Sequence, residues 1–374
     1  MVVRHLETIL NKYLFQSKAI IIYGARQTGK TTLVHHLLSN YKDKILSLNG
    51  DDTDIREMLA KPNPTKFTPI IGNAKIVLLD EAQRIQNAGL VLKIIHDNFK
   101  DIQLIATGSS SFDLANRISE PMTGRKFEFM LYPFSFSEMV DYHGFVKEKR
   151  LLNHRLVYGY YPDIALSTGF ENKLLKALAS SYLYKDLLVL ETIHKPVLLE
   201  KILKALAYQI GSEVSYSELA QLLDSDKGTI EKYIDLLEKA CIIFRLESLN
   251  RNVRNEIKKG RKIYFYDNGI RNAIVGNLVP LSSRTDQGLL WENFLLSERM
   301  KYLENHEIDA NIFFWRTTQQ QEIDYIEEIH QNLYAYEFKW SAVKKAFLPK
   351  TFSKAYPGSK FHVISPDNMH DFII

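Results

Sequence analysis

The first third of the chain alternates short apolar segments with amphipathic ones. The continuous apolar run at residues 19–23, rich in branched side chains, is typical of a strand buried on both faces. Further strands are predicted at residues 44–48, 75–79, 102–106 and 127–131, and helices at residues 3–14, 30–39 and 90–98. Because strands alternate with helices, we expect a parallel sheet covered on both faces, and so an α/β domain over residues 1–135.

The pattern becomes helical and rich in tyrosine after this domain, and residues 136–195 are predicted to form a helical connector. Residues 196–280 are predicted to contain three helices and then two strands, with Ser215 and Glu218 forming a capping box for the second helix. This order is typical of a winged helix-turn-helix. A helix at residues 288–305 followed by short strands predicts a second α/β domain over residues 281–374.

Composition narrows the class of protein. The chain has 374 residues, of which 45% are hydrophobic and 25% are charged, as in ordinary globular proteins of two or three domains. The net charge of +4 is too small to identify a polyanionic partner by itself. The single cysteine, Cys241, excludes an intramolecular disulfide, and no signal peptide, membrane span or zinc-ligand array is evident. We therefore expect a cytoplasmic protein that does not enter a membrane.

The segment Gly24 to Thr31, GARQTGKT, matches the phosphate-loop pattern G-x-x-x-x-G-K-[ST] and lies between a predicted strand and a predicted helix. Glycines let backbone N–H groups turn toward phosphates, and the helix N-terminus adds its positive dipole end. Lys30 is expected to reach the β- and γ-phosphates of ATP, and the Thr31 hydroxyl to ligate Mg²⁺. The predicted nucleotide-binding residues are Gly24, Ala25, Arg26, Gln27, Thr28, Gly29, Lys30, Thr31 and Thr32.

Two carboxylates follow the third predicted strand, at Asp80 and Glu81. Asp80 suits the Mg²⁺ site, and Glu81 is the candidate that orients or deprotonates the attacking water. The alternative is that the pair merely caps the following turn.

Thr107 ends the fourth strand at the edge of the sheet where the ligand is expected, so it is a candidate sensor of the γ-phosphate, or else a helix cap. Arg125 is a candidate for stabilising transition-state charge, from the same chain or across a subunit boundary. A solvated surface arginine is the equal alternative.

Together with GARQTGKTTL, the segments LDEAQ at 79–83, TGSS at 107–110, Gly124-Arg125 and LYPFSFSE at 131–138 resemble the prokaryotic AAA-type ATPases that carry a C-terminal DUF4143 region. The resemblance covers essentially the whole chain. It implies a P-loop sheet with strand order 5-1-4-3-2, Asp80 and Glu81 as the Walker B pair, Thr107 as sensor and Arg125 as an arginine finger. It also implies a winged helix followed by a restriction-endonuclease-like domain.

A basic loop joins the two strands of the predicted winged helix. It contains a single acid and six cations that are candidate contacts for the phosphates of double-stranded DNA, namely Arg251, Arg254, Lys258, Lys259, Arg261 and Lys262. The preceding helix mixes acids and bases evenly, so a solvated or protein-facing hairpin remains the alternative.

The last domain places acidic residues at alternate positions of two predicted strands. Asp324 on one strand, with Glu337 and Lys339 on the next, matches the D…E-x-K arrangement of restriction-endonuclease-like nucleases, and Glu292 adds a further carboxylate. Such a cluster is expected to bind Mg²⁺ and activate water. The alternative is the polar side of a solvent-facing hairpin.

These observations favour an Mg²⁺-dependent ATPase whose nucleotide state controls a DNA-facing C-terminal half. The runner-up is a slow nucleotide switch that docks protein partners. A small-molecule kinase is a third class, which Glu81 beside Asp80 disfavours because the pair selects water as acceptor. The sequence leaves the oligomeric state open.

Overall fold

The computed structural model describes residues 1–108, 122–188, 195–250, 260–317, 319–341 and 346–374. The chain divides into two compact units, each described separately below. The first is Met1–Pro133 with Lys239–Cys241, and the second is Phe134–Glu238 with Ile242–Ile374.

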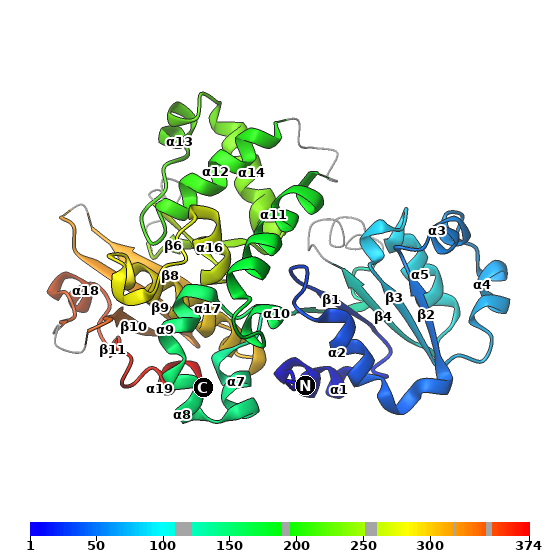
Figure 1. The fold of residues 1–374 in the computed structure, drawn as a ribbon. Coiled ribbons are helices and arrows are strands. Elements are labelled where there is room, and N and C mark those ends of the chain that lie inside the picture. Colours follow the sequence, from blue (N-terminus) through cyan, green and yellow to red (C-terminus); the bar gives the residue numbers. More distant parts are fainter. Residues whose placement is uncertain (109–121, 189–194, 251–259, 318, 342–345) are drawn as a thin grey trace. The chain divides into compact units, whose positions relative to one another are not determined.

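The first unit is built on a parallel five-stranded sheet in the order β2-β3-β4-β1-β5 (Figure 1). This is the expected order 5-1-4-3-2 read from the other edge, and it confirms the P-loop fold. All four neighbouring pairs run parallel, as buried apolar strands joined by helices should. The strands are β1 (Ala19–Tyr23), β2 (Ile45–Asn49), β3 (Ile76–Asp80), β4 (Gln103–Gly108) and β5 (Lys126–Met130).

Helices cover both faces of this sheet because successive side chains of a strand point to opposite faces. Ile20 and Ile22 of β1 pack in a core with helices α1 and α2, whereas Ala19 and Ile21 pack in a second core with α3, α4 and α5. These helices are α1 (His5–Tyr13), α2 (Lys30–Leu37), α3 (Thr53–Leu59), α4 (Pro64–Ile71) and α5 (Ala88–Asn98). The short α3 and α4 were not predicted from the sequence.

The second unit begins with helices. They are α7 (Phe136–His143), α8 (Phe145–Arg150), α9 (Leu152–Tyr158), α10 (Pro162–Ala165), α11 (Glu171–Leu188), α12 (Pro196–Tyr208), α13 (Tyr216–Leu222) and α14 (Lys227–Lys239). After two strands come α16 (Asn268–Val275) and α17 (Gln287–Asn305), and the shorter α18 (Lys350–Ala355) and α19 (His370–Ile373) lie before and after the last strand. None of the helices in the described parts of the chain combines the length and apolarity needed to cross a membrane.

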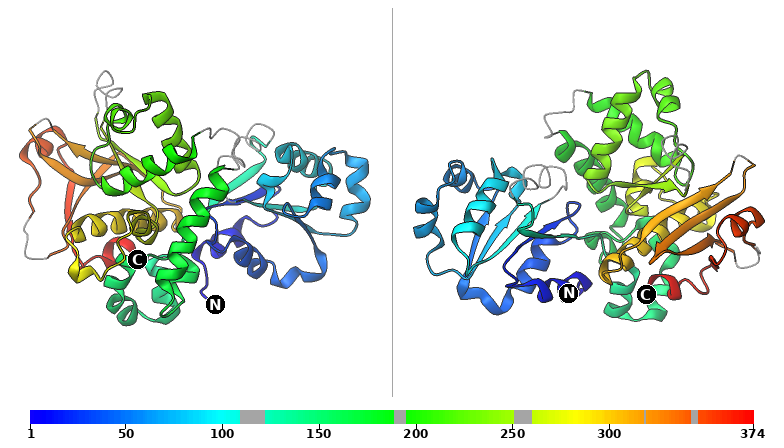
Figure 2. Two further views of the ribbon diagram at one scale, coloured as in Figure 1. Left: turned by 45° about the horizontal axis from the view of Figure 1, so that its top comes forward. Right: turned by 180° about the vertical axis from the view of Figure 1, so that it is seen from behind.

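The strands of the second unit form one six-stranded sheet in the order β11-β10-β9-β8-β6-β7 (Figure 2). The hairpin predicted for the winged helix is present as the antiparallel pair β6–β7, preceded by α12, α13 and α14. Its first strand also pairs in parallel with β8, so the hairpin and the C-terminal strands share a sheet. The strands are β6 (Ile243–Ser248), β7 (Arg261–Phe265), β8 (Asn311–Arg316), β9 (Glu322–Ile329), β10 (Asn332–Phe338) and β11 (Lys360–Ile364).

The segment that begins at Gly159 has a structural role in this unit. The carboxylate of buried Asp267 accepts a hydrogen bond of 2.6 Å from the N–H of Tyr160. A Cβ atom on Gly159 would lie 2.0 Å from Asp267 Oδ1, so only glycine allows this approach. The Tyr160 hydroxyl in turn donates to buried Glu148, at 2.8 Å. The segment thus joins α9 to the start of α16 through buried polar groups.

Candidate nucleotide site

The phosphate loop turns sharply between β1 and α2. Three residues have positive φ angles, 154° at Gly24, 59° at Gln27 and 91° at Gly29. A Cβ atom on Gly24 would lie 2.2 Å from the carbonyl oxygen of Leu131, so the start of the loop requires glycine. The loop therefore has the tight, glycine-dependent path that phosphate binding needs.

Lys30 is the first residue of α2 and is buried against the loop. Its Nζ donates to the carbonyls of Gly24 and Ala25, at 2.9 and 2.8 Å. The Thr28 hydroxyl also donates to the Ala25 carbonyl, at 2.8 Å. These bonds place the ammonium group inside the curve of the loop, against the loop's own carbonyls.

The two halves of the predicted metal site meet. Thr31 Oγ1 donates to Asp80 Oδ2 at 3.0 Å, although 49 positions separate the residues. The hydroxyl of Thr107, which is buried, donates to Asp80 Oδ1 and accepts from the N–H of Glu81 at 3.3 Å. Three predicted residues from α2, β3 and β4 thus converge at one carboxylate, because parallel strands end at the same edge of the sheet.

Glu81 follows Asp80 in a left-handed conformation, with φ of 49°. It precedes the short helical turn Ala82–Arg84, and its side chain does not cap that turn. Instead, its carboxylate accepts a hydrogen bond of 2.5 Å from the amide of Gln83. The capping alternative therefore finds no support at Glu81.

The oxygen atoms at this edge fit Mg²⁺. The ion takes hard oxygen ligands, often only one or two from the protein, and keeps several waters. Thr31 and Asp80 offer a hydroxyl and a carboxylate oxygen 3.0 Å apart, which suits such a site.

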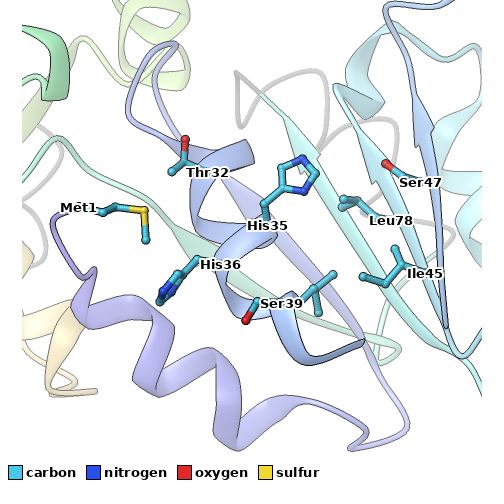
Figure 3. Close-up of a pocket in the computed structure, with 9 residues that line it drawn as sticks. Met1, Thr32, His35, His36, Ser39, Ile45, Ser47 and Leu78 are labelled. Carbon is cyan, nitrogen blue, oxygen red and sulfur yellow. The ribbon is translucent and has the colours of Figure 1, made fainter. Parts of the chain in front are cut away.

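Thr32, the last predicted nucleotide-binding residue, lies on the exposed side of α2 and lines a pocket of about 740 Å³. Figure 3 shows the pocket between α2 and the strands β2 and β3, with His35 and Leu78 among its walls. It begins at the first turn of α2, directly after the predicted metal ligand.

Arg125 lies at the end of the strands opposite to the phosphate loop, too far away for a role in its own active site. It directly precedes β5, whose first residue pairs with Ala19 at the start of β1. The phosphate loop follows the other end of β1, a strand's length or about 16 Å away at 3.3 Å per residue. The guanidinium pairs with Asp97 instead, at 3.0 Å. The structure therefore corrects the expectation of an arginine finger acting within one chain.

The predicted DNA contacts are only partly visible. Arg251, Arg254, Lys258 and Lys259 lie outside the described residues. Arg261 is half-buried, with its guanidinium over the ring of Tyr216, at 5.2 Å from the centroid.

Lys262, by contrast, is 2% exposed and is paired with Glu322 at 2.5 Å and Glu292 at 3.5 Å. Its side chain points into the protein because side chains alternate along β7. The prediction that Lys262 contacts DNA is therefore wrong.

The four residues of the predicted nuclease-like site gather in the second unit. Asp324 and Glu337 face each other on neighbouring strands, and Lys339 Nζ lies 2.5 Å from Glu337. Burial, followed by the charges of Glu292 and Glu337, raises the pKa of Asp324 well above its ordinary value. The four residues therefore lie close together in the second unit.

The cluster does not fit a metal centre. Lys262 brings a cation among its carboxylates, the Tyr264 hydroxyl donates to Glu292 at 2.6 Å, and Asp324 accepts from a backbone N–H at 2.8 Å. In the parts of the chain that the structure describes, no three His, Cys, Asp or Glu side chains are placed to hold a metal ion. Sequence reasoning missed Lys262 and Tyr264 because nothing local marks which strand will face the acids.

The five-stranded sheet, the phosphate loop and the Thr31–Asp80 pair define a P-loop ATPase domain. Residues 16–140 match the AAA domain family, residues 149–280 match a domain of unknown function (DUF8612), and residues 287–370 match DUF4143. The chain thus combines an AAA domain with a C-terminal DUF4143 domain, which confirms the resemblance seen in its motifs.

Two relatives that the chain matches over most of its length are both named only as uncharacterized proteins. An uncharacterized protein of Mycobacterium tuberculosis is 24% identical over 334 residues, which cover 88% of this chain and 72% of the relative. An uncharacterized protein of Methanocaldococcus jannaschii is 28% identical over 311 residues, covering 71% and 64%. Among solved structures, the Walker-type ATPase of Pyrococcus abyssi aligns with a TM-score of 0.50 at 15% identity, over 73% of this chain and 96% of that protein. The last likeness supports the fold alone.

Proposed function

We propose that this protein is a cytoplasmic, Mg²⁺-dependent ATPase whose nucleotide state controls a DNA-facing C-terminal half. The observation that carries the proposal is the 3.0 Å hydrogen bond between Thr31 and Asp80, next to Glu81. It brings the end of the phosphate loop and the acid-bearing end of β3 to one point, which is where a bound triphosphate would meet its metal and its attacking water.

Each residue has a separate role in this proposal. The loop amides and the Lys30 ammonium hold the triphosphate by charge and hydrogen bonding. Thr31 and Asp80 would hold Mg²⁺, which supplies charge neutralisation at the phosphates. Glu81 accepts the proton of the attacking water, while Gln83 orients its carboxylate. Thr107 donates to the Asp80 carboxylate and accepts from the N–H of Glu81, and these contacts support a role as sensor of the γ-phosphate.

Phosphate release from ATP tests the site. Wild type should hydrolyse ATP only with Mg²⁺ present, and Lys30→Ala should lose nucleotide binding. Glu81→Gln should bind ATP normally and hydrolyse it about 10²- to 10⁴-fold more slowly, the usual contribution of a positioned general base. An inability of purified wild type to bind ATP would refute the proposal.

Control of a DNA-facing half is tested by adding duplex DNA to the same assay. Stimulated hydrolysis is expected, together with binding whose salt dependence reports the phosphates contacted. Replacing Lys258, Lys259 and Arg261 by Glu should weaken binding and flatten that salt dependence. Unchanged affinity would remove DNA from the proposal and leave a nucleotide switch that docks protein partners, whereas a phosphorylated product other than free phosphate would indicate a kinase.

The proposal does not extend to DNA cleavage, because the Lys262 ammonium lies among the carboxylates that a metal would need. Wild type with Mg²⁺ or Mn²⁺ is expected to leave single- and double-stranded DNA intact. Cleavage by wild type that is lost in Asp324→Ala would instead establish a nuclease.

A further inference from the structure

A buried arginine lies behind the phosphate loop. Arg4 precedes α1 and is 7% exposed. Its Nη1 donates to the carbonyl of Thr28 at 2.8 Å, and its Nη2 donates to the carbonyl of Tyr132 at 2.7 Å. The match to the AAA domain begins at residue 16, so this arginine lies outside it. A permanently charged side chain therefore ties the loop to the residues that follow β5.

The bond to Thr28 sets the direction of a loop amide. In a trans peptide the C=O and the following N–H point in opposite directions, and the described chain has no cis peptide bonds. A Thr28 carbonyl turned toward Arg4 therefore turns the N–H of Gly29 away from it. Gly29 is the N-cap of α2, the position whose amide faces a bound phosphate in this type of loop.

The start of the loop, at Gly24, rests on Leu131, which is the neighbour of Tyr132 in the segment after β5. Leu131 donates its N–H to the carbonyl of Tyr23 at 2.7 Å, and its carbonyl leaves no room for a side chain on Gly24. Leu131 thus fixes where the loop begins, and Tyr132, through Arg4, fixes where it ends. A guanidinium suits this bridge because its N–H groups are held in a rigid fork, which orients both carbonyls with one side chain.

We propose that Arg4 is a positioning residue for the nucleotide, which keeps the Gly29 amide aimed at the phosphates and adds positive potential behind the loop. The inference rests on the proposed function of this loop as the ATP site. It assigns a role in binding to the segment before α1. The 19 residues from position 5 to position 23 separate this segment from the phosphate loop.

The test compares four proteins, wild type, Arg4→Ala, Arg4→Lys and the control Arg150→Ala, which removes an exposed arginine of α8. Fluorescent ATP is titrated onto each, KM and kcat are measured by phosphate release, and melting is followed without nucleotide. Arg4→Ala should bind ATP about 10- to 100-fold more weakly, the loss expected for charge-assisted hydrogen bonds. Arg4→Lys should recover only part of the affinity because an ammonium lacks the fork. Arg150→Ala should bind like wild type.

A raised KM in a variant whose melting temperature lies within about 2 °C of wild type separates positioning from a folding defect. If Arg4→Ala does not fold, Arg4→Lys decides the question. Affinity equal to wild type in the folded variant overturns the inference. Failure of the proposed function is distinguishable, because it would appear in wild type as an absence of ATP binding.

Discussion

Asp80 is the residue on which the site converges. It lies at the end of a fully buried strand and accepts hydrogen bonds from Thr31 and Thr107, which come from other elements. A carboxylate that already has two hydroxyl partners is fixed in position before any ligand binds, and preorganised groups lose less entropy on binding. At the scale of residues, the site is therefore held together by short polar bonds across the sheet edge.

Arg125 is expected to be dispensable within a single chain. Because it lies at the opposite edge of the sheet and pairs with Asp97, Arg125→Ala should change kcat for ATP hydrolysis by less than about twofold, as for other exposed ion pairs. If kcat falls much further, mixing Arg125→Ala with Lys30→Ala tests an action across subunits. Activity recovered in the mixture would show that one chain supplies the arginine to another.

At the scale of elements, glycines mark where two segments approach most closely. Gly159→Ala should destabilise the protein by roughly 3 kcal/mol or more, because the new Cβ would displace the buried Asp267 carboxylate from the N–H of Tyr160. The matched control is Gly144→Ala, which also combines a positive φ with an extended ψ, 91° and 146° against 75° and −160°, but has no atom within 4 Å of the new Cβ. It should cost only the backbone strain, about 1–3 kcal/mol. Equal midpoints in urea unfolding of the two variants would contradict the packing argument.

The residues around Asp286, just before α17, predict a specific pH dependence. Burial alone would raise the pKa of Asp286, but hydrogen bonds from Arg284 and Arg271 outweigh it and lower the pKa to about 2. A depressed carboxylate pKa contributes stability above the unfolded-state pKa of about 4, and this is lost as pH falls toward 2. Asp286→Asn should therefore cost about 1–2 kcal/mol at pH 7, after allowance for solvent screening, and less below pH 4.

Urea unfolding at pH 7, 5 and 3.5 measures this difference. The control is Asp309→Asn at an exposed position, which should show little difference from wild type at any of these pH values. A cost for Asp286→Asn that stays constant from pH 7 to pH 3.5 would refute the assignment of the charge pair.

At the scale of the whole molecule, the chain has two units with separate cores, and the proposed function requires the first to influence the second. Hydrogen exchange with and without ATP and Mg²⁺ tests this requirement. Slower exchange is expected at the phosphate loop and the end of β3, because bound ligand suppresses local opening. Altered exchange in residues 134–374 as well is expected if nucleotide state controls the C-terminal half. Changes confined to the first unit would favour a nucleotide site without such control.

The strands of the first unit were predicted to within about a residue or two, because continuous apolar runs bounded by charged residues locate buried strands directly. The helices α3 and α4 were not predicted because they are short, seven and eight residues, and α4 contains prolines at positions 64 and 69. Likewise, the sequence indicated a hairpin at β6–β7, but not that β6 would also pair with β8. Such pairing joins segments far apart in the chain, and local periodicity carries no information about it.

The functional groups likewise divide into those that a contiguous motif fixes and those that tertiary packing fixes. The phosphate loop and the Asp80–Glu81 pair are contiguous motifs, so the amino-acid order alone determines which groups are presented and at which strand end. Only the tertiary structure decided how scattered charges pair, with Arg4 joined to Tyr132, Lys262 turned inward to Glu322, and Arg125 held at the far edge. The physical reason is that hydrophobic burial follows a local pattern, whereas the partner of a charge depends on which distant element packs beside it.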